Sequence, residues 1–132
     1  MKKYGLGFDG EAFAAEYLEG LGFTVLEKNF ISRFGEIDII AKTDDGKYLC
    51  FVEVKTRKSG KNYASGLESV SAVKQNKIIK TAEYYIAKNS RIVEKEKLQP
   101  RFDCIEINIP EKDGEHDFSN VDLKYIANAF GT

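Results

Sequence analysis

The sequence predicts one three-layer α/β domain, spanning residues 1–132, in which helices cover both faces of a mixed β-sheet. Two segments, residues 7–21 and 69–88, carry apolar side chains at helical spacing. Four others are rich in β-branched and aromatic residues, which is typical of strands. The order helix, three strands, helix, strand and short terminal element favours a sheet between two helical layers.

The composition favours a globular protein of the cytoplasm. Apolar residues make up 42% of the chain and charged residues 31%, and no apolar run approaches the roughly 18 residues that would span a membrane. The N-terminus lacks the apolar core of a signal peptide, so we expect no export and no membrane contact. Cys50 and Cys104 lie in strand-like runs without a CxxC pair, which favours buried thiols in a reducing compartment.

Residues 7–21 are predicted to form the first helix. Asp9 suits its N-cap, and Gly22 suits the position just after its end. Glu11 shares a helical face with the residues three, four and seven places further on. These are the apolar residues Ala14, Ala15 and Leu18. Glu11 therefore lies on or beside the buried face, where it either stabilises the helix start or serves a site.

Three strands are expected next, and the last two form a hairpin. Residues 23–31 predict the first, before a turn at Ser32 to Gly35. Residues 36–42 and 47–55 predict the other two, joined at Asp45-Gly46, which is a strong hairpin signal. Both hairpin strands are mostly apolar and should lie inside the sheet. Charged residues within them need a partner or a metal, because burying an unpaired charge is costly.

The hairpin register decides which of these charges meet. A two-residue loop pairs residues whose numbers sum to 91, so Asp38 lies opposite Glu53, and Glu36 opposite Lys55, on one face. Opposed like charges destabilise a sheet unless a positive group lies between them. We therefore expect Mg²⁺ or Mn²⁺, which prefer oxygen ligands, between Asp38 and Glu53.

Other loop lengths remain open. A four-residue loop over 43–46 would place Asp38 opposite Phe51, with Glu53 as a diagonal neighbour on the same face. A three-residue loop would separate the two carboxylates onto different faces.

Positive charge is concentrated in residues 55–80, although the net charge of the chain is −1. Glu68 is the only acid in this segment, against seven basic residues: Lys55, Arg57, Lys58, Lys61, Lys74, Lys77 and Lys80. A basic segment beside an acidic site indicates local nucleic-acid binding, and a solvated lysine face is the alternative. The residues predicted to contact DNA are Arg57, Lys58 and Lys61 in a loop over 56–68, and Lys74, Gln75 and Lys77 on the following helix. For Gln75, a structural role at the helix start stays open.

Residues 69–88 predict the second long helix, with Ser69 as its cap and one apolar face. The rest of the chain is predicted as a charged connector, an alternating strand, a turn, and a short strand or helix tail. In order, these are residues 90–100, 101–109, 111–120 and 121–130.

Asp38, followed after fourteen residues by Glu53-Val54-Lys55, forms a D…ExK pattern across the hairpin. Two carboxylates can bind a divalent metal, which acidifies a bound water and stabilises charge on a phosphate. A lysine two residues after the glutamate shares its strand face and can orient that water. The pattern resembles the PD-(D/E)xK nuclease superfamily, with Ile37 in place of the proline.

Longer motifs resemble the YraN-like family of small bacterial proteins. They are GFDGEAFAAEYLEGLGFTVLEKNF, GEIDIIA, FVEVKTR, a lysine-bearing helix, RFD and a terminal NAF, from Gly7 to Phe130. The resemblance implies a restriction-endonuclease-like fold related to archaeal Holliday-junction resolvases. It also implies that the nuclease positions are held by Glu11, Asp38, Glu53 and Lys55.

The sequence thus predicts a metal-dependent endonuclease that hydrolyses DNA, including branched or structured DNA. Asp38 and Glu53 would hold the metal, Glu11 would ligate it directly or through water, and Lys55 would position the attacking water. Symmetric cleavage of a four-way junction would require a homodimer. The alternative is a non-catalytic DNA-binding or assembly module, because a fold does not fix a function.

Overall fold

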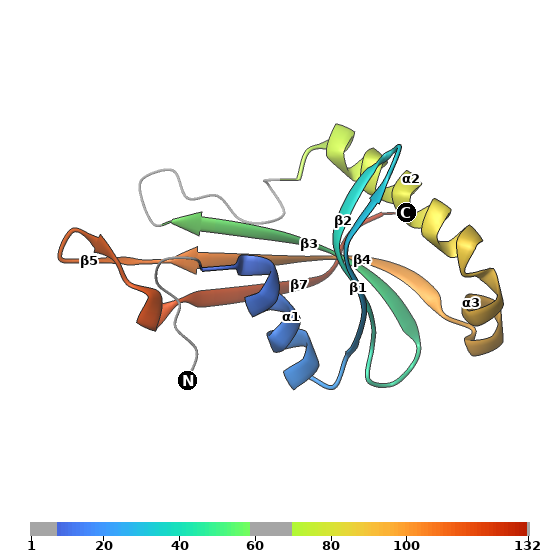
Figure 1. Cartoon of the computed structure of the whole chain (residues 1–132), viewed down its shortest axis with the longest axis horizontal. Coiled ribbons are helices and arrows are strands. Elements are labelled where there is room, and N and C mark those ends of the chain that lie inside the picture. The colour runs from blue at the N-terminus through green and yellow to red at the C-terminus, as the bar shows by residue number, and fades with distance from the viewer. Residues whose placement is uncertain (1–7, 59–69, 132) are drawn as a thin grey trace.

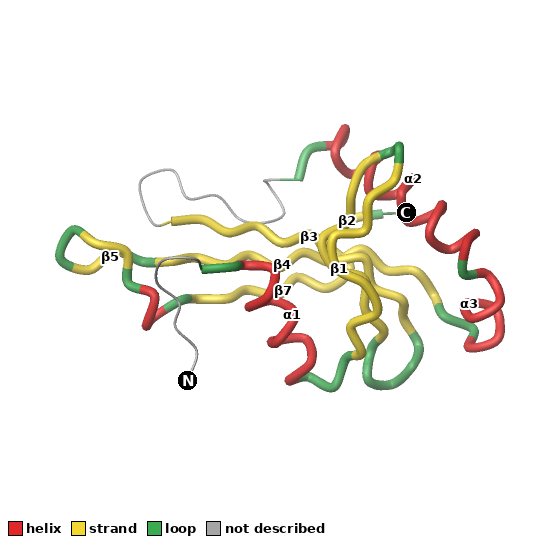
Figure 2. Tube along the Cα trace, viewed as in Figure 1, coloured by secondary structure: helices red, strands yellow, loops and turns green. Residues whose placement is uncertain are grey.

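The computed structural model describes residues 8–58 and 70–131 and consists of a five-stranded mixed sheet with helices on both faces (Figures 1 and 2). The sheet order is β1-β2-β3-β4-β7, in which β3 and β4 are parallel and the other neighbours antiparallel. The helices are α1 (Gly10–Gly20), α2 (Ala72–Lys88) and α3 (Ser90–Glu96). The strands are β1 (Thr24–Ser32), β2 (Gly35–Lys42), β3 (Tyr48–Lys58), β4 (Gln99–Ile109), the short hairpin β5 (Glu111–Lys112) and β6 (Glu115–His116), and β7 (Asp122–Phe130).

Two apolar cores, one on each face of the sheet, hold the layers together. On one face, Leu18 of α1 packs with Ile39 of β2 and Ile105 of β4. On the other, Ile78 of α2 packs with Phe51 of β3. The expected three-layer α/β architecture is confirmed, and it is compatible with a restriction-endonuclease-like fold.

The helix α1 begins and ends where its capping residues predict. The Asp9 side chain accepts hydrogen bonds from the backbone N–H groups of Glu11 (3.0 Å) and Ala12 (3.2 Å). At the other end Gly22 has φ +92°, and its N–H donates to the Glu19 carbonyl at 2.9 Å, as expected of the residue after a helix.

The central hairpin has the predicted register but a wider loop. Ile39 pairs with Val52, and the remaining pairs also have numbers that sum to 91. The predicted two-residue loop is wrong, because Thr43 N–H still donates to the Tyr48 carbonyl at 3.1 Å and leaves four residues in the loop. The side chain of Asp45 accounts for the difference: it accepts from the Thr43 hydroxyl (2.6 Å) and the Lys47 N–H (3.0 Å).

Several boundaries differ from the sequence prediction. The N-cap of α2 is Ser71, whose hydroxyl accepts from Lys74 N–H at 3.2 Å, and not Ser69, which lies outside the described residues. The strand β3 extends to Lys58, into the predicted loop. The predicted connector contains α3, a short helix with no buried residue, so its sequence had no apolar periodicity to detect. Of the two alternatives left open for residues 121–130, the structure has the strand, over Asp122–Phe130.

None of the helices in the described ranges, 8–58 and 70–131, is both long and apolar enough to cross a membrane.

Candidate active site

Asp38 lies where β2 separates from β3. Their backbone pairing ends at Ile39 and Val52, and beyond this point the two strands run apart (Figure 1). The Asp38 carboxylate then accepts the Val54 N–H at 2.8 Å, in place of the strand partner that β2 no longer provides. One further step in the same register puts Asp38 opposite Glu53, which is only 6% exposed. The structure therefore brings the two predicted carboxylates together.

The two carboxylates repel one another in a partly desolvated place. Burial first, and then the negative charge of Glu53, raise the pKa of Asp38 to about 7, against the lowering effect of the Val54 N–H. Glu11, on α1, is within electrostatic range of both: its pKa is raised by burial, then by Asp9 and Glu36, and more weakly by Glu53. The Oε1 atom of Glu11 is buried and makes no hydrogen bond.

Glu11, Asp38 and Glu53 do not form a closed metal cage. Within the described part of the chain, no three His, Cys, Asp or Glu side chains converge closely enough to hold one ion. The arrangement is a pair of carboxylates with a third acid nearby, which would leave room for water or substrate oxygens as further ligands.

Lys74 is the counter-ion of this site. Its Nζ lies 2.9 Å from the Glu53 Oε1, although the sequence placed Lys74 among the DNA contacts. Lys74 precedes the buried Ile78 by one helical turn, so it lies at the edge of the α2 face that packs on the sheet. That spacing indicated that Lys74 borders the sheet, but not which acid it would meet.

Lys55 lies beside Lys74 and shares the Glu53 side of the sheet. A hydrogen bond with Lys74, then burial and the positive charge of Lys74, lower the pKa of Lys55, while Glu53 and Asp38 act in the opposite direction. Two lysine amino groups and two carboxyl groups therefore occupy one small region, as expected of a site prepared for a charged ligand.

Of the other predicted DNA contacts, Gln75 has the structural role that was left open. Its amide donates to the Val70 carbonyl at 2.9 Å. Lys58 is exposed, and Arg57 is half-buried with an Nε that makes no hydrogen bond. Lys61 lies outside the described residues.

Glu106 is a buried acid that the sequence analysis did not single out. It is 1% exposed, and neither of its carboxylate oxygens has a hydrogen-bond partner. It lies directly across from Lys55 in the parallel β3–β4 pair. After burial, the charges of Glu53 and Glu106 help raise the pKa of Cys104 to about 11. Side chains alternate between the two faces along β4, which puts Glu106 on the same face as Cys104. This alternation is the sequence signal that could have identified Glu106 as buried.

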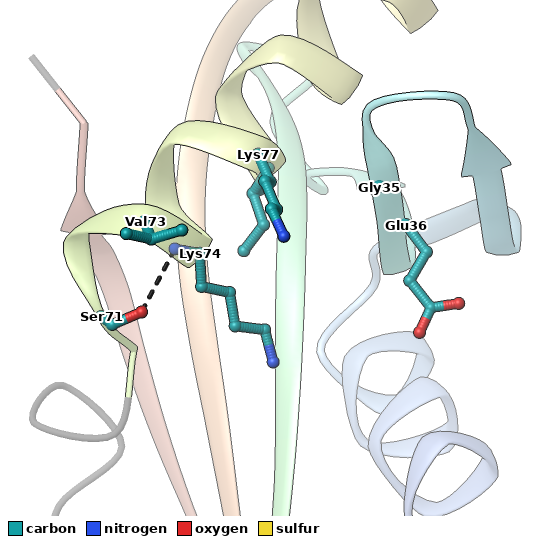
Figure 3. Close-up of a pocket in the computed structure, with 7 residues that line it drawn as sticks. Gly35, Glu36, Ser71, Val73, Lys74 and Lys77 are labelled. Atoms are coloured by element: carbon teal, nitrogen blue, oxygen red, sulfur yellow. Dashed lines mark hydrogen bonds between the residues drawn. The ribbon is translucent and has the colours of Figure 1, made fainter.

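A cavity of about 370 Å³ adjoins the site, between the start of β2 and the first turns of α2 (Figure 3). Its walls include Gly35 and Glu36 from β2, and Val73, Lys74, Lys77 and Ile78 from α2. The exposed Lys77, a predicted DNA contact, is thus a cavity residue.

The raised pKa of Asp38 predicts a pH-dependent stability in metal-free buffer. Between about pH 4 and 7 the folded protein keeps a proton on Asp38 that the unfolded chain has lost, so the free energy of unfolding should fall as pH rises. The wild-type protein loses this stability between pH 4.5 and pH 8, and Asp38→Asn does not. The free energy of unfolding of Asp38→Asn should therefore rise by about 1–4 kcal/mol relative to that of wild type over this range. Urea unfolding at both pH values measures this difference. Asp44→Asn, in the exposed turn, is the control, and an equal change in both variants would contradict the prediction.

Comparison with known proteins adds a family match. A family model described as "Uncharacterised protein family UPF0102" matches residues 10–107. A UPF0102 protein of Clostridium botulinum strain 657 is 43% identical over 125 residues, covering 95% of this chain and 93% of the relative. A UPF0102 protein of Clostridium kluyveri is 47% identical over 102 residues, covering 77% of this chain and 78% of the relative. The matched region includes Glu11, Asp38, Glu53 and Lys55.

Proposed function

Because this chain belongs to the uncharacterised protein family UPF0102, whose description assigns no activity, we propose its function from its site: a metal-dependent nuclease that hydrolyses DNA phosphodiester bonds. The family membership agrees with the YraN-like resemblance of the sequence. The observation that carries the proposal is the close pair Asp38 and Glu53, with Lys55 on the same side of the sheet.

The residues fit a hard divalent cation. Asp38 and Glu53 offer carboxylate oxygens, and their mutual repulsion is the feature that such an ion would relieve. Glu11 offers a buried oxygen without a partner, directly or through water. Lys74 now neutralises Glu53, so a cation at this site has to share or displace that contact.

In this proposal the chain's own groups position the reactants. Asp38, held by the Val54 N–H, and Glu53 present oxygens from two strands that diverge at this point. Lys55 extends from the same strand as Glu53 and orients the attacking water or the phosphate. A bound Mg²⁺ or Mn²⁺ would supply an acidified water and stabilise charge on the phosphate oxygens.

A non-catalytic DNA-binding module is the second candidate. It is favoured by the 2.9 Å Lys74–Glu53 contact, which balances one carboxylate without any metal. Metal binding and cleavage separate the two candidates, because a binding module needs neither.

We expect Mn²⁺ to bind wild-type protein, and Asp38→Asn to weaken that affinity by at least about 10–100-fold, since a direct ligand contributes at least as much as the groups that orient it. Isothermal titration calorimetry measures this. Glu36→Gln is the control: it removes a nearby exposed acid and should change the affinity far less. The same variants are then tested for cleavage of linear, flapped and four-way DNA with Mg²⁺ or Mn²⁺. Equal Mn²⁺ affinity of wild type and Asp38→Asn would refute the metal site.

A further inference from the structure

The cavity between β2 and α2 has the size of a ligand site. Its volume of about 370 Å³ falls within the ~300–1,000 Å³ typical of pockets for small organic molecules. At one end β2 passes close to the helix: a Cβ atom on Gly35 would lie 3.4 Å from the Cβ of Lys77 and 3.5 Å from the Thr81 hydroxyl. These are ordinary van der Waals separations, so the space would accept a Cβ atom, and glycine suits this position because of its φ of +151°.

Two of the residues that line the cavity interact with residues of the candidate active site. Lys74 lines it and also contacts Glu53 at 2.9 Å. Glu36 lines it on the opposite side, and its negative charge helps raise the pKa of Glu11. A molecule in the cavity and a phosphate at the carboxylate pair can thus belong to the same strand of nucleic acid.

The lining combines apolar surface with charge of both signs. Val73, which is 66% exposed, offers apolar surface on which a flat ring can pack, and the buried Ile78 lines the cavity beside it. Lys77 makes no ion pair within the described residues, and its ammonium group is therefore available to a phosphate. Lys74, Lys77 and Glu36 project around the same space (Figure 3).

The carboxylate of Glu36 favours a whole nucleotide, rather than a free phosphate ion, as the ligand of the cavity. A carboxylate at the rim repels a lone phosphate, but it accepts hydrogen bonds from the exocyclic amine of a base. A base inside a duplex is stacked and paired and enters a cavity only at the cost of breaking these contacts, whereas an unpaired base turns outward more readily.

We propose that this cavity binds one unpaired nucleotide of the DNA strand, next to the phosphodiester that is cut. The base packs on the exposed Val73, and its phosphate pairs with Lys77. The proposal rests on the nuclease function above, and it narrows the substrate to DNA with a single-stranded segment beside the cleavage point.

The test measures binding without catalysis. Fluorescence anisotropy in EDTA compares a short labelled single strand, the duplex of the same sequence, and a strand with the same phosphates but abasic sugars. The single strand is expected to bind about tenfold more tightly than the abasic strand, as contacts to one base allow, and more tightly than the duplex. Equal affinity for the abasic strand would show that only phosphates are contacted and would overturn the proposal.

Substitutions of residues that line the cavity test whether the single strand binds there. Lys77→Gln should lower the single-strand affinity about tenfold, as expected for loss of one charge-assisted hydrogen bond, and should flatten the slope of log affinity against log salt by about 0.7. Val73→Asp should also weaken binding, by repelling the phosphate. Lys80→Gln is the matched control: it makes the same charge change at an exposed position of α2 outside the cavity lining. Equal effects of Lys77→Gln and Lys80→Gln would overturn the proposal.

The two proposals can fail separately. If wild type cuts DNA with Mn²⁺ but the cavity variants bind like the control, the nucleotide site is wrong and the nuclease remains. If wild type never cuts DNA but Lys77→Gln loses single-strand affinity, the nucleotide site remains and the nuclease is wrong.

Discussion

Lys55→Ala is expected to lower the rate of DNA cleavage by about 10²–10³-fold, the loss seen when one donor that stabilises transition-state charge is removed. Lys55 lies on the Glu53 side of the sheet and within electrostatic range of both carboxylates. Its charge matters most when negative charge builds on the phosphate, so the rate should suffer more than DNA affinity. Single-turnover cleavage at saturating DNA and Mn²⁺ measures the rate, and anisotropy in EDTA measures the affinity.

The structure also constrains how Lys55→Ala affects folding. Lys74 stays on Glu53 at 2.9 Å, so the variant keeps a counter-ion at the acidic pair. We expect the free energy of unfolding to change by less than about 1 kcal/mol. Lys47→Ala, in the exposed loop just before β3, is the control for loss of a lysine and should cut DNA at the wild-type rate. Wild-type cleavage by Lys55→Ala would exclude the role assigned to this lysine.

The largest expected effect on stability is that of Asp103→Asn, at about 3–5 kcal/mol, because it removes the charge from a buried ion pair. Asp103 is fully buried on the α1 face of the sheet, across from Val52. Its two oxygens accept from Arg101 Nε and Nη2, both at 2.9 Å, from the Tyr125 hydroxyl and from the Asn128 N–H at 2.8 Å. Asparagine would replace one acceptor oxygen with an NH2 group, which donates and cannot accept from these donors.

Urea unfolding measures the free energy of unfolding of wild type and of Asp103→Asn. Asp122→Asn, at an exposed position of β7, is the control and should change it by no more than about 0.5 kcal/mol. Asp103 and Glu53 lie on opposite faces of the sheet, so folded Asp103→Asn should still bind Mn²⁺. A loss below about 1 kcal/mol would mean that this network contributes little to stability.

Much of the fold could be predicted from local sequence, because caps and turns depend on contacts between near neighbours. Asp9 and Gly22 mark the two ends of α1. The Asp45-Gly46 turn indicated the register that brings Asp38 opposite Glu53, although the loop itself is longer. The exceptions were segments with weak local signals, such as α3, which has no fully buried residue.

The charge partners of the site depended on contacts distant in sequence. Lys74 reaches Glu53 because α2 packs its Ile78 face on the sheet, and the periodicity of a helix does not say which strand it will cover. Asp103 likewise collects donors from β4 and β7, which the pattern of a single strand cannot reveal. The position where β2 leaves β3, and with it the space between the two carboxylates, follows from how the twisted sheet fits between two cores. Sequence patterns encode periodicity and turns, whereas the pairing of distant charges is set when the layers pack.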